Sequence, residues 1–327
     1  MIKISVCVPV YGVEKYIERC ARSLFEQTLT DGVEFIFVND CTKDKSIEVL
    51  RNVLADYPTR QPQTRIIEHA QNQGVSKTRN TALINAAGEF ICYADPDDFL
   101  KLNALEKLLE TAQTQNADFV SAAMCVQYDD HEEFPPALAY DNKADYLADM
   151  LTRKIPCHIW NTLVRKTLYT QNNIIFPEIL NMGEDFSVTP QLIHFAEKIA
   201  FCPEVLYCYY RGNVSSYCNT VKLKHLQDIT QANNLLHKFF STANPPASPE
   251  LLQAMRVGNF LEMQGMAAAD LELLRWLKEN FKCRIWKLDP DIYLKLKISN
   301  ILFQLGLLRP IVWCTKLLRK LRSMKKQ

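Results

Sequence analysis

Apolar residues follow two alternating periods over the first 125 residues of the chain. Short runs rich in β-branched and aromatic residues are each followed by a longer segment with apolar residues at helical spacing. We expect strands at 2–10, 34–38, 65–68, 89–94 and 118–126, and helices at 14–27, 45–54, 75–87 and 102–114. Strands and helices that alternate in this way are typical of an α/β fold with a mostly parallel sheet flanked by helices.

The second half of the chain is patterned differently. Residues 142–217 are less regular, with a helix expected at 186–195 and an aromatic strand at 206–211. After residue 221 the pattern turns helical, and Ser248-Pro249 and Asp289-Pro290 each place a capping residue before a proline, a common helix opening. We therefore predict an α/β domain over 1–220 and a helical extension over 221–327.

Composition narrows the class of protein. The 327 residues are 48% apolar and 23% charged, as in folded globular chains and unlike disordered or collagen-like ones. No window holds about 18 uninterrupted apolar residues, and the first apolar run stops at Gly12 without a cleavage site, so we interpret it as a strand and not a signal peptide. The eleven scattered cysteines match no zinc or redox spacing, which favours reduced thiols in the cytoplasm.

The basic residues are unevenly distributed. Residues 309–327 contain seven of the 38 lysines and arginines and none of the 37 acidic residues. The rest of the chain therefore has six more acidic than basic residues. A mildly acidic body argues against nucleic-acid binding. The segment Arg309–Gln327 has one apolar face with Trp313 beside it, which indicates a basic amphipathic helix at an anionic membrane surface. A terminal helix packed on the body is the alternative.

Chemistry-bearing residues follow the predicted strands. Strand one ends at Pro9-Val10-Tyr11, strand two at Asn39-Asp40, strand three before Asn72-Gln73-Gly74, and strand four at Asp95-Pro96-Asp97-Asp98. Parallel sheets bind ligands beyond the carboxyl ends of their strands. We therefore expect these carboxylates, amides and the aromatic ring to share one edge of the sheet.

Five ordered segments resemble the family 2 glycosyltransferases of bacteria: VPVYGVEKYIERCARSLFEQ, FIFVNDCTKDKS, NQGVSKTRNTAL, GEFICYADPDDFL and GED. The resemblance covers about residues 2–217. It implies a GT-A fold, a nucleotide-diphosphate sugar donor, and inversion at the sugar's anomeric carbon. Cys41-Thr42 stands where the family often has Gly-Ser, and Thr162 where a lysine is common, so these two positions depart from the family pattern.

The resemblance also assigns roles to single residues. It implies that Mn²⁺ or Mg²⁺ is held by Asp97 with Asp95, which suits cations that prefer oxygen ligands. The same tripeptide recurs at Asp289-Pro290-Asp291, where we interpret it as a helix cap because no strand precedes it. The donor-binding residues that the resemblance implies are Pro9, Val10, Tyr11, Asp40, Asn72, Arg79, Asp95 and Arg211. Asp40 would accept from the base of a UDP-sugar; an Asx-turn in its own loop is the alternative.

Glu184-Asp185 follows a glycine and opens a predicted helix. An inverting transferase needs one carboxylate to take the proton of the acceptor hydroxyl, and the resemblance assigns this general base to Asp185. Stabilisation of the helix amino terminus by both acids is the alternative. No residue pattern indicates a serine or cysteine nucleophile.

These features together predict a metal-dependent inverting glycosyltransferase. Its expected substrates are a UDP-sugar and a surface glycan or lipid-linked acceptor, at the inner face of a bacterial membrane. Two rival hypotheses stay open: a nucleotide-binding partner subunit without turnover, and a sugar-phosphate nucleotidyltransferase, although the glycine-rich basic loop of the latter is missing after strand one. A dinucleotide-dependent dehydrogenase is disfavoured because no G-x-G-x-x-G occurs.

Overall fold

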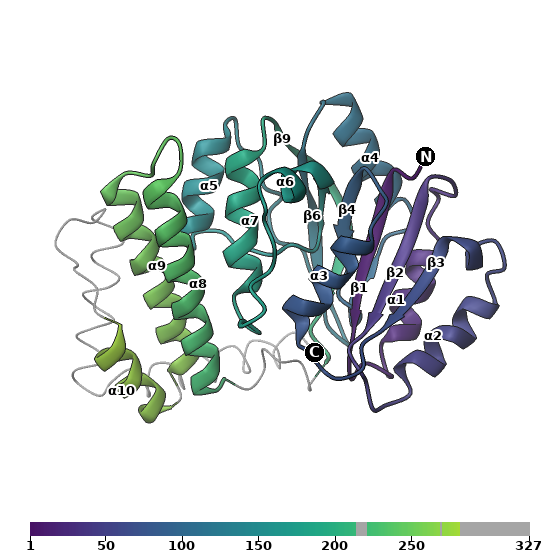
Figure 1. The fold of residues 1–327 in the computed structure, drawn as a ribbon, viewed down its shortest axis with the longest axis horizontal. Helices are drawn as coiled ribbons and strands as arrows, with labels where there is room; N and C mark the ends of the chain where they lie inside the picture. Colours follow the sequence, from purple (N-terminus) through teal and green to yellow (C-terminus); the bar gives the residue numbers. More distant parts are fainter. Residues whose placement is uncertain (214–220, 269, 282–327) are drawn as a thin grey trace. The chain divides into compact units, whose positions relative to one another are not determined.

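The computed structural model describes residues 1–213, 221–268 and 270–281 (Figure 1). The chain divides into two compact units, one made of 1–147 and 157–219, the other of 148–156 and the residues from 220 onward. The segment Arg309–Gln327 and Asp289-Pro290-Asp291, for which we predict a membrane-binding helix and a helix cap, lie outside the described residues.

The first unit is built on one mixed sheet of nine strands in its described part, in the order β3-β2-β1-β4-β8-β6-β9-β5, with β7 paired to β6. The strands are β1 (Ile4–Val10), β2 (Val33–Asn39), β3 (Thr64–Glu68), β4 (Phe90–Tyr93), β5 (Phe99–Leu100), β6 (Phe119–Gln127), β7 (Glu132–Glu133), β8 (Thr162–Arg165) and β9 (Ile199–Tyr210). The pairs β1–β2, β2–β3, β1–β4 and β6–β9 are parallel, whereas β5, β7 and β8 pair antiparallel. β1, β2 and β4 therefore end at the same edge.

The helices of this unit connect the strands. They are α1 (Ile17–Phe25), α2 (Ser46–Ala55), α3 (Val75–Asn85), α4 (Ala104–Thr114), α6 (Lys166–Gln171) and α7 (Glu184–Phe195), with a short 3₁₀ turn at Gln61–Gln63. Helix α5 (Lys143–Leu151) spans the division between the units. In α1 the buried residues Ile17, Cys20 and Leu24 recur every three or four positions, which gives the helix one apolar face toward the sheet.

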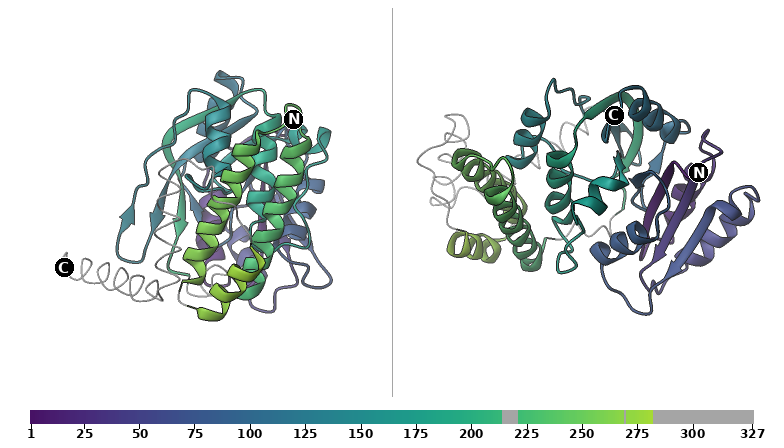
Figure 2. Two further views of the ribbon diagram at one scale, coloured as in Figure 1. Left: turned by 90° about the vertical axis from the view of Figure 1, so that its left-hand side faces the viewer. Right: turned by 45° about the horizontal axis from the view of Figure 1, so that its top comes forward.

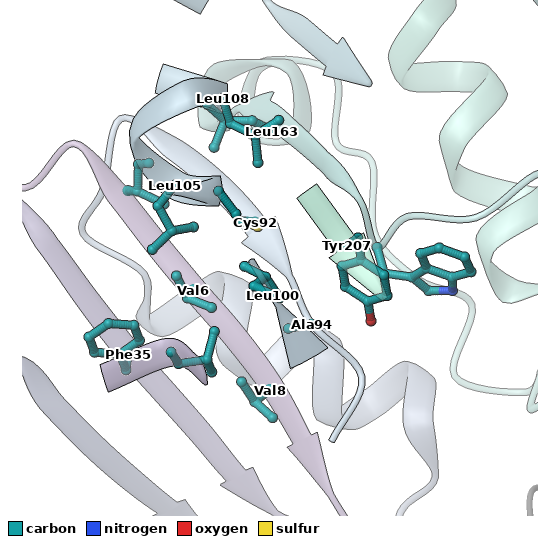
Figure 3. Close-up of a cluster of buried hydrophobic side chains, with 14 of the residues drawn as sticks. Val6, Val8, Phe35, Cys92, Ala94, Leu100, Leu105, Leu108, Leu163 and Tyr207 are labelled. Atoms are coloured by element: carbon teal, nitrogen blue, oxygen red, sulfur yellow. The ribbon is translucent and has the colours of Figure 1, made fainter. Parts of the chain in front are cut away.

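Buried residues cover both faces of the central strands. Alternate residues of β1 and β2, such as Val6, Val8 and Phe35, join the apolar side chains of α1 and α4 in one core cluster, part of which Figure 3 shows. On the other face Tyr93 donates a hydrogen bond to the carbonyl of Arg79 in α3 and meets the ring of Phe176 at 5.4 Å. A sheet buried on both faces explains why its strands are continuous apolar runs in the sequence.

The described part of the second unit is helical. It contains α8 (Leu223–Thr242), α9 (Pro249–Ala267) and α10 (Leu271–Asn280), and Figure 2 shows α8 and α9 side by side. Ser248 caps α9 as its Oγ accepts the N–H of Leu251 at 3.2 Å, which confirms the predicted helix start. None of the helices in the described ranges combines the length and apolar character that crossing a membrane would require.

Candidate active site

A cavity of about 860 Å³ opens at the carboxyl edge of β1, β2 and β4. Its lining comes from segments far apart in the sequence: the three strand ends, the amino terminus of α3, and the loop before α7. Of the residues predicted from the sequence, it includes Pro9, Val10, Tyr11, Asp40, Asn72, Arg79, Asp95 and Asp97. The expected convergence of the strand ends is therefore present in the structure.

Asp40 lines this cavity and is almost completely buried. Its Oδ1 accepts the backbone N–H of Gln73, and its Oδ2 accepts that of Gly74, both at 2.8 Å. Gly74 has a φ of 86°, a conformation that favours glycine, and it begins helix α3. The Asx-type hydrogen bond of the neighbouring loop is made by Asn39, whose Oδ1 accepts the N–H of Thr42. The Asx-turn alternative therefore does not describe Asp40.

The turn Asp95–Asp98 after β4 is held at Asp97 by two side chains from other parts of the chain. Oδ2 of Asp97 accepts from Asn213 at 2.8 Å, and the carbonyl of Asp97 accepts from Arg19 of α1 at 2.7 Å. The guanidinium of Arg19 lies over the ring of Tyr210, 4.0 Å from its centroid. Burial, reinforced by the charge of Asp95, raises the pKa of Asp97. Negative charge from neighbouring carboxylates is thus concentrated at this turn, where Asp95 is paired with Arg79.

Asp98 ties the same turn to strand β9. It is buried, accepts from the hydroxyl of Tyr207 at 2.7 Å and from the backbone N–H of Tyr210 at 2.8 Å. The Tyr207 hydroxyl in turn accepts the N–H of Asp95 at 3.1 Å. Burial, then the charges of Asp97 and Asp95, raise the pKa of Asp98. Asp98 therefore supports the turn from below and does not line the cavity.

Arg79 joins the turn after β4 to the first residues of α7. Its side chain is 3% exposed; Nη2 lies 3.0 Å from Oδ1 of Asp95, and Nη1 contacts Oε1 of Glu184 at 2.8 Å and Oδ1 of Asp185 at 2.5 Å. Burial alone would lower the pKa of Arg79, but these three carboxylates outweigh it and raise that pKa. The family resemblance implies that this arginine reaches the nucleotide or its phosphates; in the structure, its guanidinium is shared by three acids.

The two adjacent acids of α7 have different surroundings. Glu184 lines the cavity, whereas Asp185 is outside the lining and its Oδ2 accepts the N–H of Ile159 at 3.2 Å. Burial, then the charge of Asp185, raises the pKa of Glu184 to about 7. Burial also raises the pKa of Asp185, although Arg79 opposes it. The pair can therefore hold a proton near neutral pH.

Arg211 is the predicted donor residue outside the cavity lining. It lies next to β9, with its guanidinium 5.0 Å from the ring centroid of Tyr209.

Four supporting residues were missed by sequence reasoning: Arg19, His69, Tyr207 and Asn213. His69 carries a signal that could have found it, because it follows directly on strand β3. Asn213 also had a signal, because it lies two residues after Arg211, which the resemblance assigns to the donor. Arg19 and Tyr207 have none, since the local pattern does not connect their elements to the site.

Comparison with known proteins defines the class. Residues 5–174 match the model of the family "Glycosyl transferase family 2". The chain therefore belongs to this family and is a glycosyltransferase, which confirms the resemblance stated above. Among its relatives, the "Uncharacterized glycosyltransferase EpsJ" of Bacillus subtilis (strain 168) is 31% identical over 251 residues, covering 73% of this chain and 71% of EpsJ.

TarS of Staphylococcus aureus (strain MW2), a poly(ribitol-phosphate) beta-N-acetylglucosaminyltransferase, is 27% identical over 210 residues, which are 64% of this chain but 35% of TarS. The crystal structure of TarS 1–349 with UDP-GlcNAc matches the fold with a TM-score of 0.59 at 19% identity, covering 93% of this chain and 92% of that one. The mannosyltransferase PcManGT from Pyrobaculum calidifontis, in complex with GDP-Man and Mn²⁺, matches with a TM-score of 0.57 at 17% identity, covering 92% and 80%. These matches confirm the predicted GT-A fold.

Proposed function

We propose that this glycosyltransferase moves a sugar from a UDP-sugar to a cell-envelope glycan or its lipid carrier, with inversion at the anomeric carbon. The nucleotide-binding and catalytic part is residues 1–220. Two relatives support the envelope assignment through their names, the minor teichoic acid biosynthesis protein GgaB of Bacillus subtilis (strain 168) and the poly(ribitol-phosphate) transferase TarS. The complex of TarS with UDP-GlcNAc supports the donor. Asp40, a buried acceptor on the cavity wall, suits the imide N–H of uracil.

The excess of negative charge in the cavity is the main observation that supports a metal-dependent mechanism. Carboxylates of Asp40, Asp95, Asp97 and Glu184 line it, whereas the arginine in that lining, Arg79, is already shared by three acids. A sugar diphosphate adds the negative charge of its phosphates. Like charges in a partly dry cavity repel strongly, so donor binding requires a counter-ion.

Asp95 and Asp97 fit a hard divalent cation, Mn²⁺ or Mg²⁺. Among the described residues, Oδ2 of Asp95 has no hydrogen-bond donor, and the pKa of Asp97 is raised by burial and by Asp95, a repulsion that a cation would relieve. No group of three or more His, Cys, Asp or Glu in the described ranges could hold a metal unaided. Phosphate oxygens and water would complete the coordination, as is usual for these ions. When bound, the cation offsets the charge that develops on the departing diphosphate.

Asp185 is the proposed general base. It takes the proton of the acceptor hydroxyl as that oxygen attacks the anomeric carbon and the bond to the diphosphate breaks. Its raised pKa makes it a stronger base than an exposed aspartate, and Arg79 and the N–H of Ile159 hold its orientation. Glu184, the neighbour on the cavity wall, is positioned by the same arginine.

The acceptor and the site of action in the cell are the next part of the proposal. We propose a lipid-linked or growing glycan as acceptor, at the cytoplasmic face of the membrane, with Arg309–Gln327 as the contact to anionic lipid. The name of TarS supports a polymeric acceptor, and the basic sequence of this segment supports its contact with anionic lipid.

The test is release of UDP from candidate UDP-sugars in the presence of Mn²⁺ and an envelope glycan acceptor. We expect EDTA to abolish turnover and added Mn²⁺ to restore it. Asp185→Asn should lower kcat by roughly 10²–10⁴-fold with the Kd for UDP nearly unchanged. Glu184→Gln is the matched control, because it removes the other acid from Arg79, and it should retain more activity.

Three outcomes would contradict the proposal. Turnover that survives EDTA argues against the metal. Activity kept in Asp185→Asn but lost in Glu184→Gln transfers the base to Glu184. Tight UDP binding without turnover on any donor and acceptor supports the non-catalytic partner subunit instead.

A further inference from the structure

His69 lies behind the carboxylate that faces the proposed nucleotide base. Its backbone N–H donates to the carbonyl of Asn39 at 2.9 Å, which extends the parallel ladder of β2 and β3 by one residue and places the His69 side chain beside Asp40. Nδ1 of His69 is 2.8 Å from Oδ1 of Asp40, and Nε2 is 2.9 Å from the hydroxyl of Thr81 in α3. The side chains of His69 and Asp40 are 7% and 4% exposed. His69 thus links two elements through one buried ring.

The donor and acceptor roles in this chain follow from the chemistry of each group. Asp40 already accepts two backbone N–H groups, so its carboxylate acts as an acceptor and Nδ1 of His69 must carry the proton. The Thr81 hydroxyl can either donate to Nε2 or accept from it, so it holds the ring in both charge states of the imidazole. Thr81 therefore fixes the ring, and the ring fixes the carboxylate.

The hydrogen bonds of Asp40 leave little freedom. A carboxylate has about four acceptor positions. Within the described residues, Oδ1 uses two, for His69 and Gln73, and Oδ2 uses one, for Gly74. One position remains, on Oδ2 of a residue that lines the cavity. A carboxylate held in this way accepts from a ring N–H and repels a ring nitrogen that carries a lone pair.

We propose that His69, oriented by Thr81, is a positioning residue for base selection: it locks Asp40 as an acceptor that admits uracil, with its N3–H, and rejects cytosine, whose N3 has a lone pair. This inference rests on the proposed function, because it assumes that Asp40 faces the base. It adds a specificity role for two residues that lie behind the cavity wall.

Calorimetric Kd values for UDP and CDP, each with Mn²⁺, test the proposal. Metal and phosphate contacts are common to both nucleotides, so the ratio of the two Kd values reports the contribution of the base to binding. We expect His69→Leu to weaken UDP roughly tenfold, since a hydrogen bond to a charged group is lost, and to change CDP much less. His69→Asn restores a side-chain N–H toward Asp40, so its ratio of Kd values for UDP and CDP should return most of the way to that of the unmodified protein. Thr81→Val should give an intermediate loss.

Ile66→Ala is the structural control. Ile66 lies on β3 and packs against the core, so this variant should lower the Tm and leave the UDP to CDP ratio unchanged. A ratio in His69→Leu equal to that of the unmodified protein would overturn the inference, as would equal losses for both nucleotides. Should His69→Leu fail to fold, the same ratio is compared between Thr81→Val and Ile66→Ala. A ratio in Thr81→Val equal to that in Ile66→Ala would then overturn the inference. Equal affinity of the unmodified protein for UDP and CDP would instead overturn the proposed donor, and the inference with it.

Discussion

The carboxylate of Glu184 provides a prediction about stability and pH. The side chain is 13% exposed and contacts the guanidinium of Arg79, which Asp185 also contacts. Burial and the Asp185 charge raise its pKa from 4.5 to about 7. Because the folded state holds this proton more tightly than the unfolded state does, folding is favoured below the unfolded pKa, and that contribution is lost as the pH rises through about 7. Glu184→Gln replaces the carboxylate by a neutral group that still accepts from Arg79.

The size of the effect follows from the two pKa values. The difference between 4.5 and about 7 corresponds to roughly 3 kcal/mol of unfolding free energy at pH 8, an upper limit for a side chain with some solvent contact. At pH 4.5 the variant and the unmodified protein should differ little, because the glutamate is then largely protonated in the fold. At pH 8 the variant should be more stable, by up to about 10 °C in Tm for a unit of this size.

Thermal and urea unfolding between pH 4.5 and 8, with EDTA and without nucleotide, measure this difference. Glu178→Gln is the control, since it removes an exposed carboxylate paired with Lys77 and should keep the pH dependence of the unmodified protein. If Glu184→Gln has the same pH slope as the unmodified protein, or is less stable than it at pH 8, the assignment of a shared proton to this pair is refuted.

Two further predictions concern backbone conformation and close packing of the backbone. Cys41 has a φ of 58°, a conformation that costs a non-glycine residue about 1–2 kcal/mol. Glycine relieves this strain but has more conformational entropy in the unfolded chain. We therefore expect Cys41→Gly to raise the unfolding free energy by about 0.5–1 kcal/mol. Asn116→Gly, at a φ of 48°, should gain less stability because asparagine tolerates this conformation. A Tm of Cys41→Gly below that of the unmodified protein would contradict the reasoning. Gly88→Ala should cost about 1–3 kcal/mol in urea unfolding, because its Cβ would lie 2.6 Å from the backbone nitrogen of Ser5 and 2.8 Å from the carbonyl carbon of Ile4. Gly265→Ala in α9, where a Cβ meets no atom within 4 Å, should not destabilise, and equal effects of the two substitutions would count against a clash at Gly88.

The elements predicted correctly share a strong local signal. β1 and β2 are buried on both faces, so the whole strand is apolar and its type is visible without a partner. β5, β7 and β8 are two to four residues long and pair antiparallel. β5 and β8 pair with strands far away in the sequence, whereas β7 pairs with the preceding strand β6. Strands this short have too few residues for a period, so the pairing that defines them is visible only in the folded chain.

The site shows the same division. Asp40 and Asp95 could be placed from the sequence because parallel strands bring their carboxyl ends to one edge. Arg79 could not be paired in advance, since its partners lie 16, 105 and 106 residues away. Glu184 and Asp185 are neighbours in sequence, but successive side chains of a helix point about 100° apart, so one lines the cavity and the other does not.

The sequence by itself therefore determined the class of fold, the family, and the edge of the sheet where the chemistry gathers, because each depends on local periods and on motifs within single loops. Only the tertiary structure decided which acids share Arg79, which of the paired acids meets the cavity, and that His69 and Thr81 stand behind Asp40. These facts depend on helix rotation and on side-chain contacts between distant segments. Such contacts form only when the sheet closes against α3 and α7, and no stretch of the sequence contains them alone.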